Sequence, residues 1–318
     1  MSAPGGGPLR FLRRHAVALA TWAVVIGGWE VASHVVAKGL LQGSPRVPSI
    51  EFLATTTLKS LSGSWTLHKW APNPATGGRE TYLGAFLALG YHSYYTLERV
   101  LLGLAVGGLA GVGTGLLVSY SRVVRRIAWG PMNFMRMVPL LAAIPLFEFW
   151  FGATTTGTTT FIGFGVWVLL VVATINAVGN VPNAYAESAR TLGASRLQTY
   201  ARIVVPRALP ELRTALLLAA GLGWSLAIGS EYIGLRTGLG TIMASAQATA
   251  NTGRMIIIAV IVIFYALLTF ALLDRAFARM VRWMPQQAAA SIWIGGVASA
   301  GAGAAVSVVE DEEFAVGA

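Results

Sequence analysis

The chain has 318 residues, of which 55% are hydrophobic and only 11% are charged, and its mean hydropathy is +0.64. Soluble domains carry about 25% charged residues, so this composition excludes an ordinary soluble protein and predicts one that resides in a lipid bilayer. The absence of cysteine excludes disulfides and thiolate-bound metals. The four histidines lie far apart and form no metal motif. A formal charge of +10 would suit nucleic acid only on a soluble basic face, so we expect no nucleic-acid partner, no metal and no cofactor.

Six apolar runs are each long enough to cross the hydrocarbon layer of a membrane, about 30 Å, as a helix. They fall at about residues 16–36, 96–119, 127–151, 159–180, 214–234 and 255–277. Most of the 23 Lys and Arg residues lie in the tail at 1–15 and in the connections on the same side as that tail. Because such an excess marks the cytoplasmic side, we expect a multi-pass membrane protein with both termini in the cytoplasm.

The segment at 16–93 is expected to hold the first span and a long extracytoplasmic loop. In this loop Pro48 and Ser49 precede an apolar-periodic stretch, which predicts a short interfacial helix. Aromatic residues just before the second span are typical of the belt at a membrane surface; they are Tyr91, Tyr94 and Tyr95.

The C-terminal stretch at 284–318 has a different composition, rich in Ala and Gly, with an acidic run at 310–313. It contains too few large aliphatic residues to drive insertion strongly. We therefore expect a flexible or surface-lying tail in preference to a seventh span.

Glycines recur every four residues in the second predicted span, at Gly103, Gly107, Gly111 and Gly115. Residues at this spacing share one helical face, where glycine allows another helix to approach closely. The spacing favours a tight helix contact within the bundle; a role in gating or in a subunit contact is the alternative.

A polar, Arg-rich segment separates the fourth and fifth spans, and it is predicted to be helical at about 183–192. Glu187 near the helix start can pair with Arg190. Ala189 and Gly193 are four residues apart and are expected to form a smooth notch on one face. A polar helical turn of this kind on a membrane protein predicts a docking element for a soluble partner, and an amphipathic surface helix without a partner is the alternative.

This segment resembles the EAA motif, the cytoplasmic loop motif of permease subunits of binding-protein-dependent ABC importers. The motif order is E-A-A, three residues, G, nine residues, I, one residue, L-P. It is matched here by Glu187, Ser188, Ala189, Gly193, Ile203, Val205 and Pro206. Ser188 and Val205 replace the motif's second Ala and its Leu with small changes in volume. Pro206 also suits the restart of a helix that leads into the membrane.

Further blocks resemble the nitrate, sulfonate and taurine group of these permeases. They lie at 97–103, 135–139, 144–152 and 230–240. The resemblance covers about residues 45–283, although the stretch at 67–92 is longer than expected for the group and the tail has no counterpart.

The resemblance implies an all-α polytopic membrane protein with six transmembrane helices and the MetI-like fold of type I ABC importer permeases, in a bacterial inner membrane. It places the permease core at 94–283 and the ATPase-coupling loop at 184–210. The implied partners are two copies of a cytoplasmic ABC ATPase, an extracytoplasmic solute-binding protein, a second permease chain, with a homodimer favoured, and membrane lipid. Since no G-x-x-x-x-G-K-[ST] motif occurs in the chain, ATP hydrolysis is expected in a separate subunit, and the chain itself is not expected to be an enzyme.

Charged residues inside predicted spans are candidates for the solute path, because charges are costly in lipid and usually face the interior. The candidates are Arg136, Glu148 and Glu231. Arg136 could attract an anion, form an internal ion pair with Glu148 or Glu231, or cap the backbone at the break before Pro139. Each glutamate could equally anchor a bend or an outer loop.

The expected solute is taurine or another aliphatic sulfonate, with nitrate, bicarbonate or a vitamin precursor as alternatives on the same architecture. An intramembrane enzyme would need paired catalytic groups at membrane depth, and a stand-alone secondary carrier would need internally repeated broken helices. Neither pattern is visible in the sequence.

Overall fold

The computed structural model describes residues 8–36, 40–41, 44–67, 70–72, 74 and 77–281. The predicted tail at 284–318 lies outside these residues, as do parts of the stretch at 67–92. The chain divides into two units, Met1–Phe270 and Ala271–Ala318, and of the second unit the structure describes only the end of the last helix.

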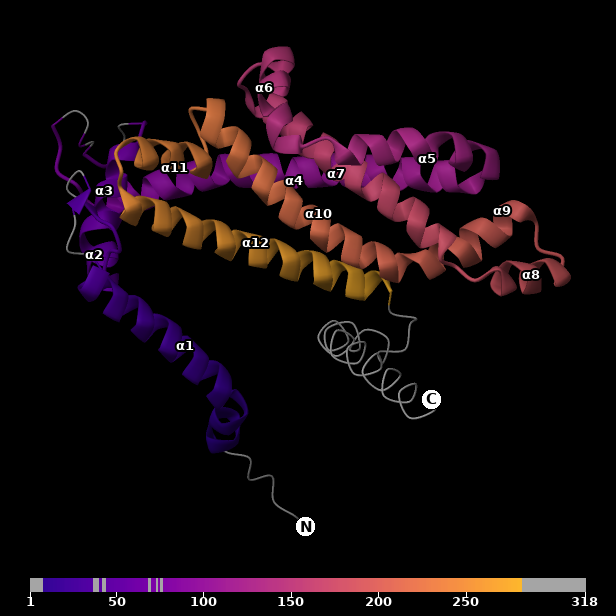
Figure 1. Cartoon of the computed structure of the whole chain (residues 1–318), viewed down its shortest axis with the longest axis horizontal. Helices are drawn as coiled ribbons and strands as arrows, with labels where there is room; N and C mark the ends of the chain where they lie inside the picture. Colours follow the sequence, from indigo (N-terminus) through magenta and orange to yellow (C-terminus); the bar gives the residue numbers. More distant parts are fainter. Residues whose placement is uncertain are drawn as a thin grey trace, which may run out of the picture. The chain divides into compact units, whose positions relative to one another are not determined.

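The described chain is almost entirely helical (Figure 1). Its helices are α1 (Pro8–Val36), α2 (Ile50–Phe52), α3 (Leu58–Ser60), α4 (Tyr82–Tyr120), α5 (Arg122–Met137), α6 (Leu140–Phe151), α7 (Thr155–Gly179), α8 (Asn183–Thr191), α9 (Arg196–Thr199), α10 (Val205–Gly234), α11 (Leu239–Ala248) and α12 (Thr252–Met280). Two π-helical turns, at Leu53–Thr57 and Tyr200–Val204, and a 3₁₀ turn at Leu61–Ser64 join neighbouring helices. The short strands β1 (Leu40–Leu41) and β2 (Ser44–Pro45) form one antiparallel pair.

Four helical segments of the described chain are long and apolar enough to cross a membrane, or five if a bent pair counts as one span. The four are Tyr82–Tyr120, Thr155–Gly179, Arg196–Gly234 and Thr252–Met280. They cover the second, fourth, fifth and sixth predicted spans. The first predicted span falls in α1, which is helical but is not one of these segments, so the full number of six stays a prediction.

The third predicted span, at 127–151, is not one straight helix. It divides into α5 and α6, which are bent by 94° at the break between them. The break lies at Val138 and Pro139, where Val138 has the extended ψ of 124°. A residue before proline is pushed out of the α conformation by the proline ring, so the sequence Val138-Pro139 accounts for the break.

Helix α4 begins at Tyr82, well before the predicted start of the second span at 96. The hydroxyl of Thr81 caps this start by accepting a hydrogen bond from the Gly84 amide at 3.1 Å. The tyrosines at 91, 94 and 95 therefore lie inside α4, whose 39 residues exceed the roughly 20 that a span needs, and their place before the membrane-crossing part stays a prediction. The predicted short helix after Pro48 is present as α2, with Ser49 as its N-cap.

The glycines spaced by four in α4 lie against α7 (Figure 1). A Cβ atom at Gly103 would collide with Ile162, and one at Gly115 would collide with Thr174. At Gly107 the obstacle is the backbone carbonyl of Gly163. The backbones of α4 and α7 are therefore in direct contact at Gly107. A backbone atom cannot move aside as a flexible side chain can, so a larger residue at this position would force the two helices apart.

We expect Gly107→Ala to lower the free energy of unfolding by about 1–3 kcal/mol, the usual cost of forcing extra volume into a packed interface. Gly113 supplies the matched control, since a Cβ atom there meets nothing within 4 Å. Thermal unfolding of the detergent-purified variants would measure the difference. Equal stability of Gly107→Ala and Gly113→Ala would contradict the close α4–α7 contact.

Candidate functional site

The segment between α7 and α10 is a bent helical arm, called the elbow below and defined as residues 182–206. Its first helix, α8, lies where the sequence predicts a helix at 183–192. The helix ends at Gly193, whose φ of +82° is favourable only for glycine. The amide of Gly193 donates to the Arg190 carbonyl at 2.9 Å and the amide of Ala194 donates to the Ala189 carbonyl at 3.0 Å. These bonds satisfy carbonyl groups at the helix end.

The second part of the elbow begins at Ser195. Ser195 and Gln198 form a capping box, in which the Ser195 hydroxyl accepts from the Gln198 amide and the Gln198 side chain accepts from the Ser195 amide. From there α9, a π-helical turn and α10 follow without interruption. Pro206 lies in the first turn of α10, where its missing N–H costs little after the widened π-helical turn.

The motif residues divide between the surface and the interior of the elbow. Glu187 and Ser188 are exposed, whereas Ala189 is only 6% exposed. Ala189 therefore faces inward whereas Gly193 is exposed, and the notch predicted from these two residues stays a prediction. Glu187 forms no ion pair with Arg190 among the described residues, so the prediction of that pair is wrong. Half-buried positions are occupied by Ile203, Val205 and Pro206.

Two leucines that the sequence analysis did not single out are the most exposed apolar side chains of the elbow. Leu192 is 88% exposed at the end of α8, and Leu197 is 63% exposed in α9. The elbow is otherwise polar, with exposed Ser, Thr and Arg side chains around them. Two exposed leucines five residues apart offer apolar surface for a contact with another protein.

The elbow is attached to the end of α4 by two side chains. The Tyr200 hydroxyl donates to the Leu116 carbonyl at 2.7 Å, and the Tyr200 ring lies edge-on to Tyr120 with 5.2 Å between ring centroids. The Arg196 guanidinium donates to the Tyr120 carbonyl at 3.1 Å. Movement of the elbow would therefore be passed to α4. The sequence of the elbow does not predict this attachment, because the residues of α4 that Arg196 and Tyr200 contact lie about 80 positions earlier in the chain.

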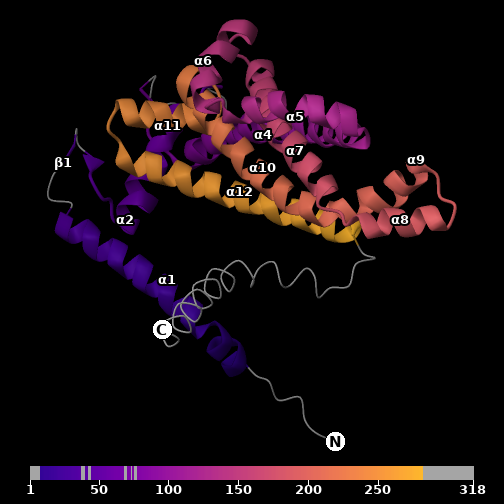
Figure 2. The ribbon, with the colours of Figure 1, turned by 45° about the vertical axis from the view of Figure 1, so that its right-hand side comes forward.

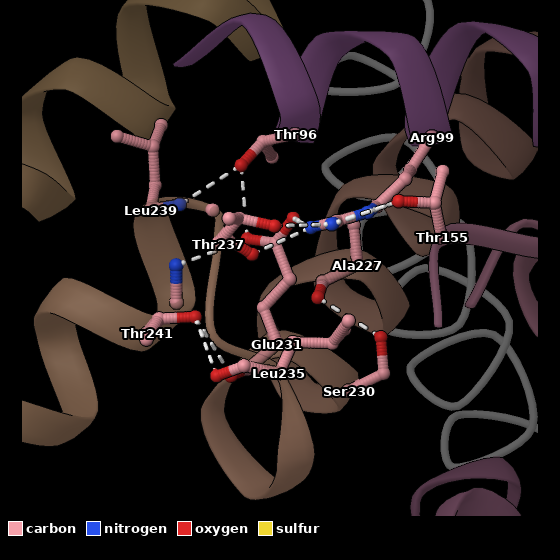
Figure 3. Close-up of polar contacts among 12 residues, drawn as sticks. Thr96, Arg99, Thr155, Ala227, Ser230, Glu231, Leu235, Thr237, Leu239 and Thr241 are labelled. Carbon is pink, nitrogen blue, oxygen red and sulfur yellow. Dashed lines mark hydrogen bonds and ion pairs between the residues drawn. The ribbon is translucent and has the colours of Figure 1, made fainter. Parts of the chain in front are cut away.

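A buried polar cluster joins the middle of α4 to the last turn of α10 (Figure 3). Its centre is the ion pair between Arg99 of α4 and Glu231 of α10, at 2.7 Å, with both side chains at most 1% exposed. Arg99 also donates to the Thr237 carbonyl and hydroxyl, both at 2.7 Å, and to the Thr155 hydroxyl at 3.1 Å. The second Glu231 oxygen accepts from Thr96 at 2.9 Å and from the Gly240 amide at 3.0 Å. Both oxygens of the Glu231 carboxylate are thus hydrogen-bonded.

The cluster fixes the turn between α10 and α11. Gly238 in this turn has a φ of +122°, and a side chain there would collide with the Glu231 carboxylate. The turn is also held by α4, since the amide of Gly238 donates to His92 at 3.0 Å and the amide of Leu239 donates to Thr96 at 2.9 Å. Arg99 and Glu231 therefore join α4, α7, α10 and α11 at one point.

The structure does not bring the three predicted path residues together. Glu231 pairs with Arg99, so the alternative of an Arg136–Glu231 ion pair is wrong. Glu148 in α6 has its carboxyl group against Gly234, and its buried Oε1 has no hydrogen-bond partner among the described residues. Arg136 is exposed in the last turn of α5 and forms no ion pair in the described part of the chain.

Arg99 is the residue that the sequence analysis missed as an interior charge. The available indication was an arginine within an apolar helix, because such a charge usually has a buried partner.

Across residues 77–281 and the earlier described segments, no group of three or more His, Asp or Glu side chains is placed to hold a metal ion.

Comparison with known proteins places these features in a family. The family model described as "Binding-protein-dependent transport system inner membrane component" matches residues 103–284. The taurine transport system permease protein TauC of Escherichia coli is 33% identical over 57% of this chain, which spans 66% of that protein's length. The putative aliphatic sulfonates transport permease protein SsuC of Escherichia coli is 29% identical over 79% of this chain and 95% of its own length.

Among solved structures, the MetNI methionine ABC transporter in an inward-facing conformation contains a similar chain. The TM-score is 0.50 and the identity 22%, with 59% of this chain and 92% of that chain covered. This likeness shows the MetI-like fold of type I importer permeases. Because the family model matches more than half of its residues, this multi-pass membrane chain belongs to the family of binding-protein-dependent transport system inner membrane components.

Proposed function

We propose that this chain is the permease subunit of an ATP-driven ABC importer that carries taurine or another aliphatic sulfonate across the cytoplasmic membrane. Two such chains would form the path, two copies of a separate ABC ATPase would dock on the elbows, and an extracytoplasmic solute-binding protein would deliver the solute. In this proposal the elbow lies in the cytoplasm, as do both termini, and the coupling role belongs to Glu187, Ser188, Gly193 and the residues around them.

The observation that carries this proposal is the elbow itself. Leu192 and Leu197 are bare on a polar element of a membrane protein, which supports a soluble docking partner. The chain has no P-loop of its own, so the partner would supply ATP hydrolysis. Tyr200 and Arg196 connect the elbow to α4, and α4 continues along the glycine contact with α7 to Arg99. A movement of the elbow would therefore be transmitted along α4 to the buried ion pair at Arg99.

The proposed solute rests on two kinds of support. Relatives at 33% and 29% identity are named for taurine and aliphatic sulfonates. Arg136, exposed and without an ion pair in the described chain, can donate charge-assisted hydrogen bonds to a sulfonate. Nitrate, bicarbonate and a vitamin precursor remain the alternative cargoes.

Transport in sealed vesicles tests the proposal. The purified chain would be reconstituted with its ATPase and binding protein, and uptake of labelled taurine, nitrate and bicarbonate would be followed with and without ATP. We expect uptake only with ATP and all three components, with taurine preferred. Uptake by this chain alone, without nucleotide, would instead identify a secondary carrier.

Replacing Arg136 with Gln should raise the KM for taurine uptake about tenfold or more, because a hydrogen bond to a charged group contributes about 1.5–3 kcal/mol. Since Arg136 is exposed, membrane abundance should stay unchanged. The exposed Arg46 supplies an Arg→Gln control on the outer loop. A loss of abundance in Arg136→Gln with normal KM would assign the residue to structure and not to the path.

A further inference from the structure

We propose that a basic pocket between α5 and the elbow binds the phosphate headgroup of an anionic phospholipid. The pocket consists of two adjoining cavities, each of about 490 Å³, that share Arg122, Arg125 and Gly179. The first cavity reaches the elbow at Arg190 and Arg196, and the second extends along α5 to Arg126. Figure 2 shows α5 beside α4 and α7, with α8 and α9 beyond their ends.

The pocket carries positive charge without a matching negative charge. Five arginines line its two cavities, and no Asp or Glu side chain does. Among the described residues none of these arginines forms an ion pair. Arg196 donates to the Tyr120 carbonyl, a neutral acceptor that leaves its charge uncompensated. Like charges gathered in one concave site repel each other and attract a counter-ion, so the arrangement favours an anion.

The size and polarity of the pocket suit a phosphate ester. A cavity of about 490 Å³ lies within the usual range of small-molecule sites, about 300–1,000 Å³. Arginine presents paired N–H groups that match the oxygens of a phosphate. The side-chain amide of Asn183, a neutral donor, lies in the same wall, so a headgroup would meet both charged and neutral hydrogen-bond partners.

The surroundings of the pocket favour a lipid over a free anion. Helix α5 is amphipathic, and its apolar residues are bare: Val123 is 67% exposed, Ile127 71% and Phe134 71%. A basic face beside an exposed apolar face is typical of a helix at a bilayer surface. Trp129, which lines the second cavity, belongs to the residue type enriched at headgroup level. A phospholipid would place its phosphate among the arginines and its acyl chains along these apolar residues.

This inference does not depend on the proposed transport function, because it concerns the chain alone and needs no ATPase or solute.

A lipid bound in this pocket would also affect the elbow. Arg190 of α8 and Arg196 of α9 belong to the pocket wall, so a bound phosphate would connect α5 to both arms of the elbow through charge-assisted hydrogen bonds.

Native mass spectrometry of the full chain tests the proposal. The detergent-purified protein would be mixed with phosphatidylglycerol or with phosphatidylcholine of the same acyl chains. We expect tighter retention of phosphatidylglycerol by the wild type. Since each arginine near a membrane surface contributes about fivefold to anionic lipid binding, Arg122→Gln with Arg125→Gln should weaken that retention about 25-fold. Arg126→Gln alone should weaken the retention of phosphatidylglycerol about fivefold. The exposed Arg202, which lines neither cavity, supplies the Arg→Gln control and should leave that retention unchanged.

Three outcomes would overturn the assignment. Equal retention of the two lipids by the wild type would show that the charge of the headgroup is not recognised. Unchanged retention in the double variant would place the lipid elsewhere. Displacement of phosphatidylglycerol by millimolar inorganic phosphate or taurine, lost in the double variant, would identify a site for a free oxyanion. Thermal unfolding without added lipid, expected to be the same for wild type and double variant, checks that the fold is intact.

Discussion

Replacing Arg99 with Gln should lower the free energy of unfolding by about 3–5 kcal/mol, the usual cost of removing one partner of a buried ion pair. The substitution leaves the Glu231 carboxylate at 0% exposure with only Thr96 and the Gly240 amide as donors. It also frees the Thr237 carbonyl, which accepts from Arg99 at 2.7 Å. An uncompensated charge is far more costly in this interior than in water, so Glu231→Gln should be destabilising by a similar amount.

The double substitution Arg99→Gln with Glu231→Gln separates the cost of a stranded charge from the value of the pair. Removing both charges leaves no ion buried, so the double variant should be more stable than either single variant. His34→Gln, which breaks the exposed His34–Glu30 pair at 3.4 Å, supplies a surface control worth at most about 1 kcal/mol. Unfolding in detergent would measure all four variants. Additive single effects, or an Arg99→Gln cost no larger than that of His34→Gln, would contradict the buried cluster.

Features that depend on neighbouring residues were readable from the sequence. The helix that ends at Gly193 was predicted within about one residue, because a glycine at a left-handed position stops a helix locally. The spacing of Gly103, Gly107, Gly111 and Gly115 predicted a helix contact, and the structure supplies its partner, α7. The pattern alone could not name that partner, since it reports only which face is smooth.

The polar cluster was missed because its parts are far apart in sequence. Arg99 and Glu231 are separated by 132 residues. Each lies in a block that resembles the permease group, at 97–103 and at 230–240, but neither block indicates that the other holds its partner. The predicted start of the second span at 96 also placed Arg99 near a helix end, where a charge needs no partner. In the structure α4 begins at Tyr82, so Arg99 lies well inside the helix and must be paired. Thr81, a residue type favoured at helix N-caps, was the feature that could have indicated the start of α4. The tyrosines that follow it lower the local hydropathy, so the apolar run was taken to begin only at 96.

The bend between α5 and α6 illustrates a different limit. Hydropathy reports whether a segment suits a membrane but not its direction, so 127–151 read as one continuous span. The proline at 139 was visible, and its effect on Val138 follows from the ring alone. What could not be predicted is the angle of 94°, which is set by the packing of α6 against α7 and α10.

The second large effect is expected at the elbow, where Leu192→Asp should abolish coupling between the proposed ATPase and transport. Leu192 is 88% exposed, so the fold loses almost no buried contact when it is replaced. If the leucine enters an apolar pocket of the ATPase, a buried carboxylate there would cost at least about 2 kcal/mol, as for a central interface residue, and affinity should fall about 30-fold or more. Thr191→Ala is the matched control on α8, because Thr191 is exposed and its hydroxyl bonds only within its own helix.

Two measurements distinguish docking from folding. Leu192→Asp should unfold at the temperature of the wild type, yet it should retain little ATPase in a pull-down from detergent and give little ATP-dependent uptake in vesicles. Thr191→Ala should match the wild type in both. Gly193→Asp is a weaker test of docking, since a φ of +82° strains any residue but glycine and alters the elbow itself. Normal ATPase retention by Leu192→Asp would mean that the bare leucines of the elbow face lipid or another copy of the chain, and the coupling role would then have to lie elsewhere.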